Sequence, residues 1–276
     1  MNSNWQNFLQ NLGEWQGSFT TFSAAGEIVS STVSILNLVA AEENKLVKFR
    51  VRRYGAEGYG SEPTTDFTEE YRTIGRQNVF FDTGAFSKGT IQISPVSDFG
   101  AEYGFVALDR RLRFVQLFDM ERKFSKVVLI REFLADSKAI EQPPLTVDRL
   151  IGRWIGQATT AYADLRNPEV IETCLEIQRI GVDQLQQTLT FGDRSISSTA
   201  LITENKLIFT DTNREILLLP DGGSSNVPLQ INSRTAVFVE AGWLVTDTDR
   251  QRMLRSYNDQ GEWVSSTHVI EHKQSS

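Results

Sequence analysis

The chain has 276 residues, of which 40% are hydrophobic and 23% charged, a balance typical of a folded globular protein rather than a disordered one. Its formal net charge is -7, with 16 basic against 17 acidic residues in positions 1–140 and 12 against 18 in positions 141–276. Neither half therefore has the basic excess that binding to nucleic acid or anionic membranes demands.

The single cysteine, Cys174, excludes an intramolecular disulfide and agrees with a reducing compartment, and its strand-like surroundings predict a buried, unreactive thiol. Residues 1–10 contain no basic start followed by an apolar run. No apolar stretch approaches the roughly 18 residues that span a bilayer. We therefore expect a cytoplasmic protein without membrane insertion.

The first predicted element is a short helix over residues 4–12. Its apolar residues recur at spacings of three and four and so share one face: Trp5, Phe8, Leu9 and Leu12. Beyond it, β-branched and aromatic residues dominate short runs separated by polar turns, which predicts an antiparallel meander that closes into a barrel. The predicted strands are 18–22, 28–38, 45–54, 68–74, 77–81, 89–93, 103–108, 112–118 and 126–133.

A polar linker over residues 139–144 ends in Pro143 and Pro144 and divides the chain into predicted domains at 1–138 and 145–276. After it the pattern restarts with a short helix that begins near Thr146 and carries Val147, Leu150 and Ile151. The strands predicted to follow are 171–180, 184–191, 198–203, 207–210, 215–219, 235–239, 243–246, 252–257 and 264–271.

A Gly-x-Trp-x-Gly motif opens both halves, at residues 13–17 and 152–156. The correspondence extends further at an offset of 139 or 140, because residues 113–119 match 252–259 and Glu132 matches Glu271. Two copies indicate duplication of a whole domain rather than a solenoid, which needs at least three repeats. The predicted fold class is all-β, with two tandem antiparallel barrels, each preceded by a short helix.

Gly-x-Trp on a first strand after a short helix resembles the calycins, which include the lipocalins and fatty-acid-binding proteins. In those barrels the tryptophan closes one end, and a basic residue of the last strand packs across it. The resemblance implies that Trp15 and Trp154 plug the two barrels and that Arg131 lies over Trp15. The second unit departs from this pattern, with Ile270 or Glu271 at the matching place.

Three segments, 80–87, 99–105 and 129–132, look like the signature of an uncharacterised family of tandem calycin-like proteins found mainly in cyanobacteria and plastid-bearing organisms. The resemblance implies a fold and a cellular setting but no reaction. Bilin lyases are more distant calycins, so the suggestion of a tetrapyrrole ligand rests only on similarity of fold.

A barrel with some interior can hold a small ligand, so inward aromatic residues and arginines are candidate ligand-binding residues. In the first unit Arg53 and Arg76 are candidates to bind a carboxylate. The candidate walls there are Phe81, Phe86, Tyr103 and Phe105. In the second unit Arg255 and Tyr257 share a face and are further candidates. Ordinary core packing for the aromatic residues and solvent exposure for the arginines remain the simpler alternatives.

The sequence offers little for catalysis. His268 and His272 lie four residues apart on a predicted strand, roughly 13 Å, which is too far to hold one metal ion. No nucleophile elbow, phosphate-binding loop or dinucleotide fingerprint is present. We predict no catalytic residue, metal or cofactor, and Glu102, a possible buried partner of Arg131, and Tyr257 are the only acid–base candidates.

The leading hypothesis is binding or carriage of a small hydrophobic or amphiphilic molecule with a carboxylate, such as a fatty acid, an apocarotenoid or a tetrapyrrole. The first alternative is a bilin lyase-like attachment chaperone or an isomerase. The second is an interaction module whose barrels are filled by side chains. Nucleic acid is not an expected partner, and the sequence specifies no oligomeric state.

Overall fold

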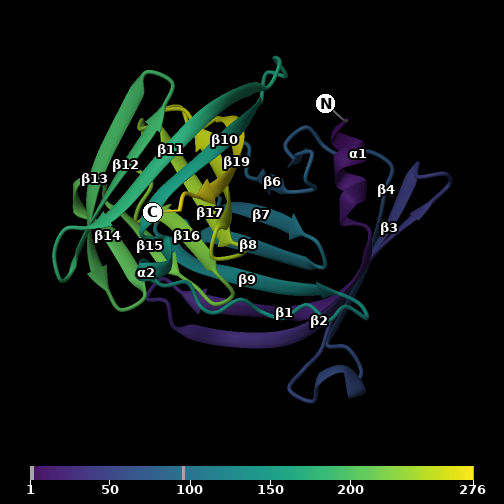
Figure 1. Cartoon of the computed structure of the whole chain (residues 1–276). Coiled ribbons are helices and arrows are strands. Elements are labelled where there is room, and N and C mark those ends of the chain that lie inside the picture. The colour runs from purple at the N-terminus through teal and green to yellow at the C-terminus, as the bar shows by residue number, and fades with distance from the viewer. Residues whose placement is uncertain (1–2, 95–96, 276) are drawn as a thin grey trace. The chain divides into compact units, whose positions relative to one another are not determined.

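The computed structural model describes residues 3–94 and 97–275, and its ribbon is built almost wholly from antiparallel strands (Figure 1). The chain begins with the helix α1 (Asn4–Phe8) and the 3-10 helix η1 (Leu9–Asn11), which together match the predicted helix. Ser3 caps α1, since its side chain accepts from the Gln6 amide while the Gln6 side chain accepts from the Ser3 amide.

The first nine strands form one sheet with the order β4-β3-β2-β1-β9-β8-β7-β6-β5. Their bounds are β1 (Gly13–Ser23), β2 (Ile28–Ala41), β3 (Leu46–Arg53), β4 (Thr65–Tyr71), β5 (Val79–Phe80), β6 (Phe86–Gly89), β7 (Phe99–Ala107), β8 (Arg110–Phe118) and β9 (Phe124–Leu134), with the 3-10 helix η2 (Gly58–Gly60) before β4. The sheet is open, with β4 and β5 as its edges.

The remaining strands form a closed barrel in sequence order from β10 to β19. The short helix α2 (Val147–Leu150) precedes it, and the 3-10 helix η3 (Thr210–Thr212) follows β14. The strands are β10 (Gly152–Tyr162), β11 (Glu169–Arg179), β12 (Gln184–Phe191), β13 (Arg194–Thr203), β14 (Lys206–Phe209), β15 (Arg214–Leu218), β16 (Gly223–Pro228), β17 (Val237–Leu244), β18 (Asp249–Tyr257) and β19 (Trp263–Lys273).

The predicted all-β class is therefore confirmed, with one closed barrel and one open sheet. The edge strand β5 has a physical reason to remain unpaired with β4, because α1 occupies its backbone groups. Asn4 accepts from the Phe80 amide at 2.7 Å and donates to the Asn78 carbonyl at 2.8 Å, and Asn7 donates to the Phe80 carbonyl at 2.9 Å. Side-chain amides thus take the place of a neighbouring strand.

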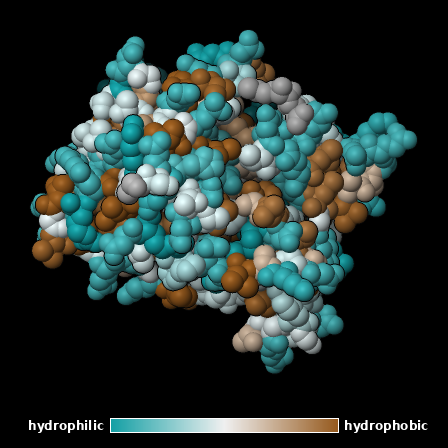
Figure 2. All heavy atoms as spheres, in the orientation of Figure 1, coloured by the Kyte–Doolittle hydropathy of each residue, from teal (hydrophilic) through white to brown (hydrophobic). Residues whose placement is uncertain are grey.

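The chain divides into two compact units that are described separately below. Unit 1 comprises residues 1–89, 102–115 and 126–140, and unit 2 comprises residues 90–101, 116–125 and 141–276. Figure 2 shows hydrophobic residues in small patches among hydrophilic ones on the face that it draws. No helix among the described residues is long and apolar enough to cross a membrane.

The Gly-x-Trp-x-Gly motif has the same structural role in each unit. Trp15 and Trp154 are both buried, and each indole donates at 2.9 Å to the carbonyl of the residue four positions earlier, Asn11 or Leu150. The second glycine of each motif lies against the last strand of its unit. A Cβ atom at Gly17 would come within 1.8 Å of the Arg131 carbonyl oxygen. These contacts explain why the motif is an architectural one.

Candidate functional site

The barrel of unit 2 encloses a cavity of about 320 Å³. Strand alternation builds its wall, since β11 points Leu175 and Ile177 inward while Glu176 faces solvent. The apolar lining comprises Leu150, Leu175, Ile177, Leu185, Leu189, Phe191, Ile196, Leu207, Phe209, Ile216, Phe238 and Leu254. Such a lining stabilises an apolar ligand by roughly 25 cal/mol for each Å² removed from water.

A buried group of charges lies at one part of the cavity wall, where β18 contributes Arg250 and Arg252. Arg252 binds Glu271 through two hydrogen bonds of 3.0 and 3.1 Å and also binds Glu240 at 3.2 Å. The Nη1 atom of Arg250 lies 3.3 Å from the Oε1 atom of Glu271. That Nη1 atom is buried and has no hydrogen-bond partner in the described part of the chain.

A third arginine, Arg214 of β15, lines the same cavity. Its guanidinium donates to the Asn226 side chain at 3.0 Å and stacks 3.7 Å from the Phe238 ring. Asn226 in turn donates to Glu240 at 3.0 Å. The lining thus carries three arginines and one glutamate, and with Glu271 behind it the cluster has a net charge of +1. That excess favours an anionic ligand group.

The local environment acts differently on the two neighbouring arginines. Burial lowers the pKa of Arg250, and the charge of Glu271 opposes this effect only in part. Burial also acts to lower the pKa of Arg252, but Glu271 and Glu240 together raise it above its ordinary value. Arg252 is consequently well compensated, whereas an additional anion beside Arg250 would relieve an electrostatic cost.

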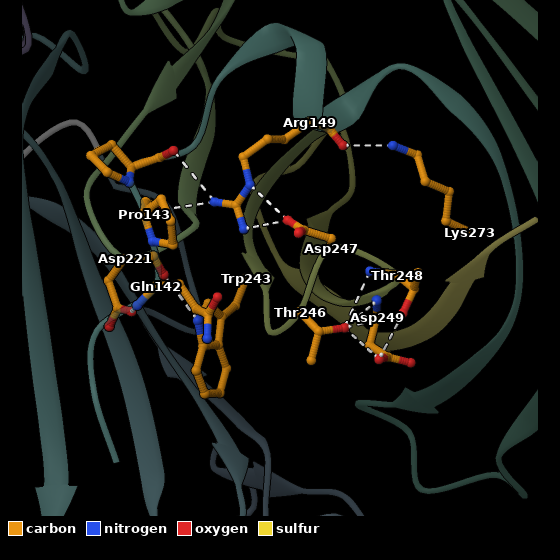
Figure 3. Close-up of polar contacts among 11 residues, drawn as sticks. Gln142, Pro143, Arg149, Asp221, Trp243, Thr246, Asp247, Thr248, Asp249 and Lys273 are labelled. Carbon is orange, nitrogen blue, oxygen red and sulfur yellow. Dashed lines mark hydrogen bonds and ion pairs between the residues drawn. The ribbon is translucent and has the colours of Figure 1, made fainter. Parts of the chain in front are cut away.

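Polar contacts join Arg149, Asp247 and Lys273 to their neighbours in unit 2 (Figure 3). Lys273, the last residue of β19, lies over the Trp154 ring at 5.1 Å and donates to the Arg149 carbonyl at 3.0 Å. Arg149 donates to the Pro143 carbonyl at 2.7 Å and binds Asp247. A basic residue therefore does lie over the tryptophan of unit 2. It is Lys273, and not a residue at the position matched to Arg131, where the sequence has Ile270 or Glu271.

Unit 1 contains a pocket of about 80 Å³ with a related charge group. Arg111 and Arg113 of β8 both bind the fully buried Glu132, at 2.7 and 2.9 Å. Glu102 joins Arg113 at 2.9 Å and Lys88 at 2.9 Å. Burial acts to raise the pKa of Glu132, but the two arginines reverse this effect and lower it to about 2. The carboxylate therefore remains ionised at all ordinary pH values.

Another hollow of about 480 Å³ in unit 2 is lined by loop residues 231–235 and 259–261 together with Ile93 and Arg122. Most of these residues are exposed, so solvent already satisfies their polar groups. It lacks both the apolar enclosure and the converging buried charges of the barrel cavity, which is the better candidate site.

The structure places the predicted residues of unit 2, Arg255 and Tyr257, on the face of β18 opposite to the residues that line the cavity. Arg255 is fully buried, lies 4.4 Å from the Trp263 ring and donates to the Tyr257 hydroxyl at 2.8 Å. Tyr257 donates to the Thr90 carbonyl at 2.8 Å, and burial raises the pKa of Tyr257 to about 12. The phenol is thus held neutral as a donor.

The predicted aromatic residues of unit 1, Phe81, Phe86, Tyr103 and Phe105, are all buried, and Phe86 also lines the small pocket.

The predicted arginines of unit 1 lie apart from that pocket. Arg53 donates to the Thr32 hydroxyl and stacks 4.9 Å from Phe19, while Arg76 is exposed in a turn.

The residue over Trp15 differs from the one expected. Arg111 of β8 lies 4.9 Å from the Trp15 ring, whereas Arg131 donates to Ser18 and Thr20 on β1. The register explains this placement, because Arg131 pairs directly with Ser18, three residues beyond Trp15. Glu102, expected beside Arg131, pairs with Lys88 and Arg113.

Sequence reasoning did not select Arg214, Arg250 or Arg252 as ligand-binding residues. A signal was available, because residues 111–113 and 250–252 share the pattern Arg-x-Arg on matching strands, and Glu132 matches Glu271. Neither histidine lines the cavity; His268 is buried with its Nε2 2.9 Å from Gln251. Among the described residues, no group of three or more His, Cys, Asp and Glu side chains could hold a metal ion.

Comparison with families of known sequence divides the chain near the predicted linker. Residues 1–137 match the N-terminal domain of the family DUF3598, a domain of unknown function. Residues 141–274 match the C-terminal domain of the biogenesis factor required for ATP synthase 1. No curated protein matches the chain.

Among solved structures, a protein of unknown function from the DUF3598 family of Nostoc punctiforme is 44% identical. The match covers 99% of this chain and 100% of that one, with a TM-score of 0.93. An S-type phycobiliprotein lyase from Guillardia theta is 14% identical over 47% of this chain and 91% of that one, with a TM-score of 0.38. The second similarity is too low to carry a functional argument.

Proposed function

The chain belongs to the DUF3598 family, as its sequence signature predicted, and we propose that the barrel of unit 2 binds a small amphiphilic molecule with a carboxylate. The apolar wall takes the hydrocarbon part of the ligand. The arginines on β15 and β18 take the carboxylate, because a guanidinium presents two parallel donors to its two oxygens.

One observation carries this proposal: an apolar cavity inside the closed barrel of strands is lined by a buried arginine that is not fully hydrogen-bonded. The volume of about 320 Å³ lies at the lower end of ligand cavities, which run from about 300 to 1,000 Å³. That size favours a fatty acid or a small apocarotenoid over a tetrapyrrole.

The test is native mass spectrometry of the purified full chain incubated with fatty acids, apocarotenoids and tetrapyrroles. We expect stoichiometric, reversible adducts with medium-chain fatty acids or apocarotenoids. Absence of any adduct across this panel would overturn the proposal. A covalent bilin adduct formed only in the presence of an apo-phycobiliprotein would instead support the attachment function considered from the sequence.

The match of residues 141–274 to a biogenesis factor for ATP synthase favours a second candidate, in which the chain assists assembly of that complex. The test mixes the purified chain with each purified soluble subunit of ATP synthase and measures complex formation by size-exclusion chromatography with calorimetry. A one-to-one complex with a single unassembled subunit supports this function. Failure to bind any of the subunits would count against it.

A further inference from the structure

The two units contain the same buried charge network at equivalent positions. Each has two arginines spaced Arg-x-Arg on one strand, a glutamate on the next strand that both approach, and a second glutamate on the preceding strand. The corresponding sets are Arg111, Arg113, Glu132 and Glu102 in unit 1, and Arg250, Arg252, Glu271 and Glu240 in unit 2.

The units differ at the residue four positions before the buried tryptophans Trp15 and Trp154. Asn11 and Leu150 are structurally equivalent, since each offers its backbone carbonyl to the indole at 2.9 Å. In unit 1 the Asn11 side chain accepts from Nη1 of Arg111 at 3.4 Å. In unit 2 the Leu150 side chain has no acceptor atom, and it lines the same cavity as Arg250.

Arg250 is consequently the less satisfied member of its pair. Its Nη1 faces Glu271 at 3.3 Å without hydrogen-bond geometry, while both oxygens of that carboxylate are bound by Arg252. Arg250 is 6% exposed, so water cannot readily complete its bonding. A buried donor without an acceptor destabilises the fold, and an acceptor atom on a ligand would complete its bonding.

From this difference we infer that Leu150 leaves Arg250 open as the carboxylate anchor of unit 2, whereas Asn11 satisfies the equivalent arginine of unit 1 with the chain's own amide. The inference rests on the proposed ligand binding and adds the residue that decides which unit binds. A carboxylate oxygen of the ligand occupies the position that the Asn11 side-chain oxygen has in unit 1. Unit 2 should then prefer a fatty acid over the matching alcohol.

The test is isothermal titration of the full chain with decanoate and with decanol. A charge-assisted hydrogen bond contributes about 1.5–3 kcal/mol, so decanoate should bind roughly tenfold to a hundredfold more tightly. Leu150→Asn supplies the internal acceptor that Asn11 provides in unit 1. It should remove most of this preference, measured as the ratio of the decanoate and decanol affinities of the same variant.

Leu201→Asn is the matched control, because it makes the same substitution at an exposed position of the barrel outside the cavity lining and should retain the preference. Arg250→Gln is the second test, and it should remove the preference even if Leu150→Asn does not fold. If neither probe binds the unmodified chain, the proposed function fails. If both bind and the preference survives Leu150→Asn or Arg250→Gln in folded protein, the assignment of Arg250 is overturned while ligand binding stands.

Discussion

Unit 1 and unit 2 each contain a buried charge network of the same kind, but their interiors differ. In unit 1 the helical segment at the N-terminus fills the space beside the network, with Phe8 packed against Tyr71 and Phe80 and Asn11 bonded to Arg111. Unit 2 retains a cavity of about 320 Å³ where unit 1 retains about 80 Å³. The two units thus share a charged framework, and the residues beside it determine how much space remains in each interior.

The network itself should be essential to folding in both units. Glu132→Gln leaves Arg111 and Arg113 buried with half of their compensating charge, and Glu271→Gln does the same to Arg250 and Arg252. Breaking a buried ion pair on one side costs about 3–5 kcal/mol. We expect each variant to lose stability of this order in urea unfolding followed by tryptophan fluorescence. A loss below about 1 kcal/mol in either variant would contradict a structural role for its network.

Lowering the pH should destabilise unit 2 before unit 1, because unit 2 contains the buried His268. Burial lowers the pKa of His268 to about 3, whereas the unfolded chain binds this proton near pH 6.5. Between these values the unfolded state carries the extra proton, so stability is lost as the pH falls from about 6.5 towards 3.

The network of unit 1 responds at lower pH. The pKa of Glu132 is lowered to about 2, so its contribution is present above about pH 4.5 and is lost only as the pH falls below that value. Unit 2 should therefore lose stability first, by about 3 kcal/mol between pH 7 and pH 4.

His268→Gln should make the free energy of unfolding less dependent on pH over this range, measured by urea unfolding at each pH. If the free energy of unfolding depends on pH equally in the unmodified chain and in His268→Gln, His268 does not stay neutral in the folded state.

The strand pattern was predictable from the sequence because alternation and turn residues are local signals. The burial of Trp15 and Trp154 was also predictable, since the same motif places each tryptophan on the first strand of its half of the chain. The open edge of the first sheet was not, because it depends on Asn4 and Asn7 reaching a strand more than 70 residues away. Arg250 was missed for a related reason: the role proposed for it depends on the side chain at Leu150, which lies 100 positions away in the sequence.

Alanine substitutions at Gly17 and Gly156 should show that the first strand packs more closely against the last strand in unit 1 than in unit 2. A methyl group at Gly17 would meet the Arg131 carbonyl oxygen at 1.8 Å, whereas one at Gly156 would meet the Ile270 carbonyl oxygen at 2.5 Å. Overpacking of this kind costs about 1–3 kcal/mol, and both strands must shift to relieve it. We expect Gly17→Ala to lower the thermal midpoint more than Gly156→Ala. The reverse order would mean that unit 1 accommodates the shift more easily.

The smallest expected effect concerns the amide contacts that hold α1 against β5. Asn4→Ala removes one bond from the Phe80 amide and one to the Asn78 carbonyl, at a cost of about 1–2 kcal/mol for the half-buried pair. If these bonds keep the sheet edge occupied, hydrogen exchange of the Phe80 amide should accelerate strongly. Amides of the barrel core, such as that of Leu185, should be unaffected and serve as the internal control. Unchanged protection at Phe80 would show that packing of Phe8, rather than the amide contacts, keeps this edge of unit 1 covered.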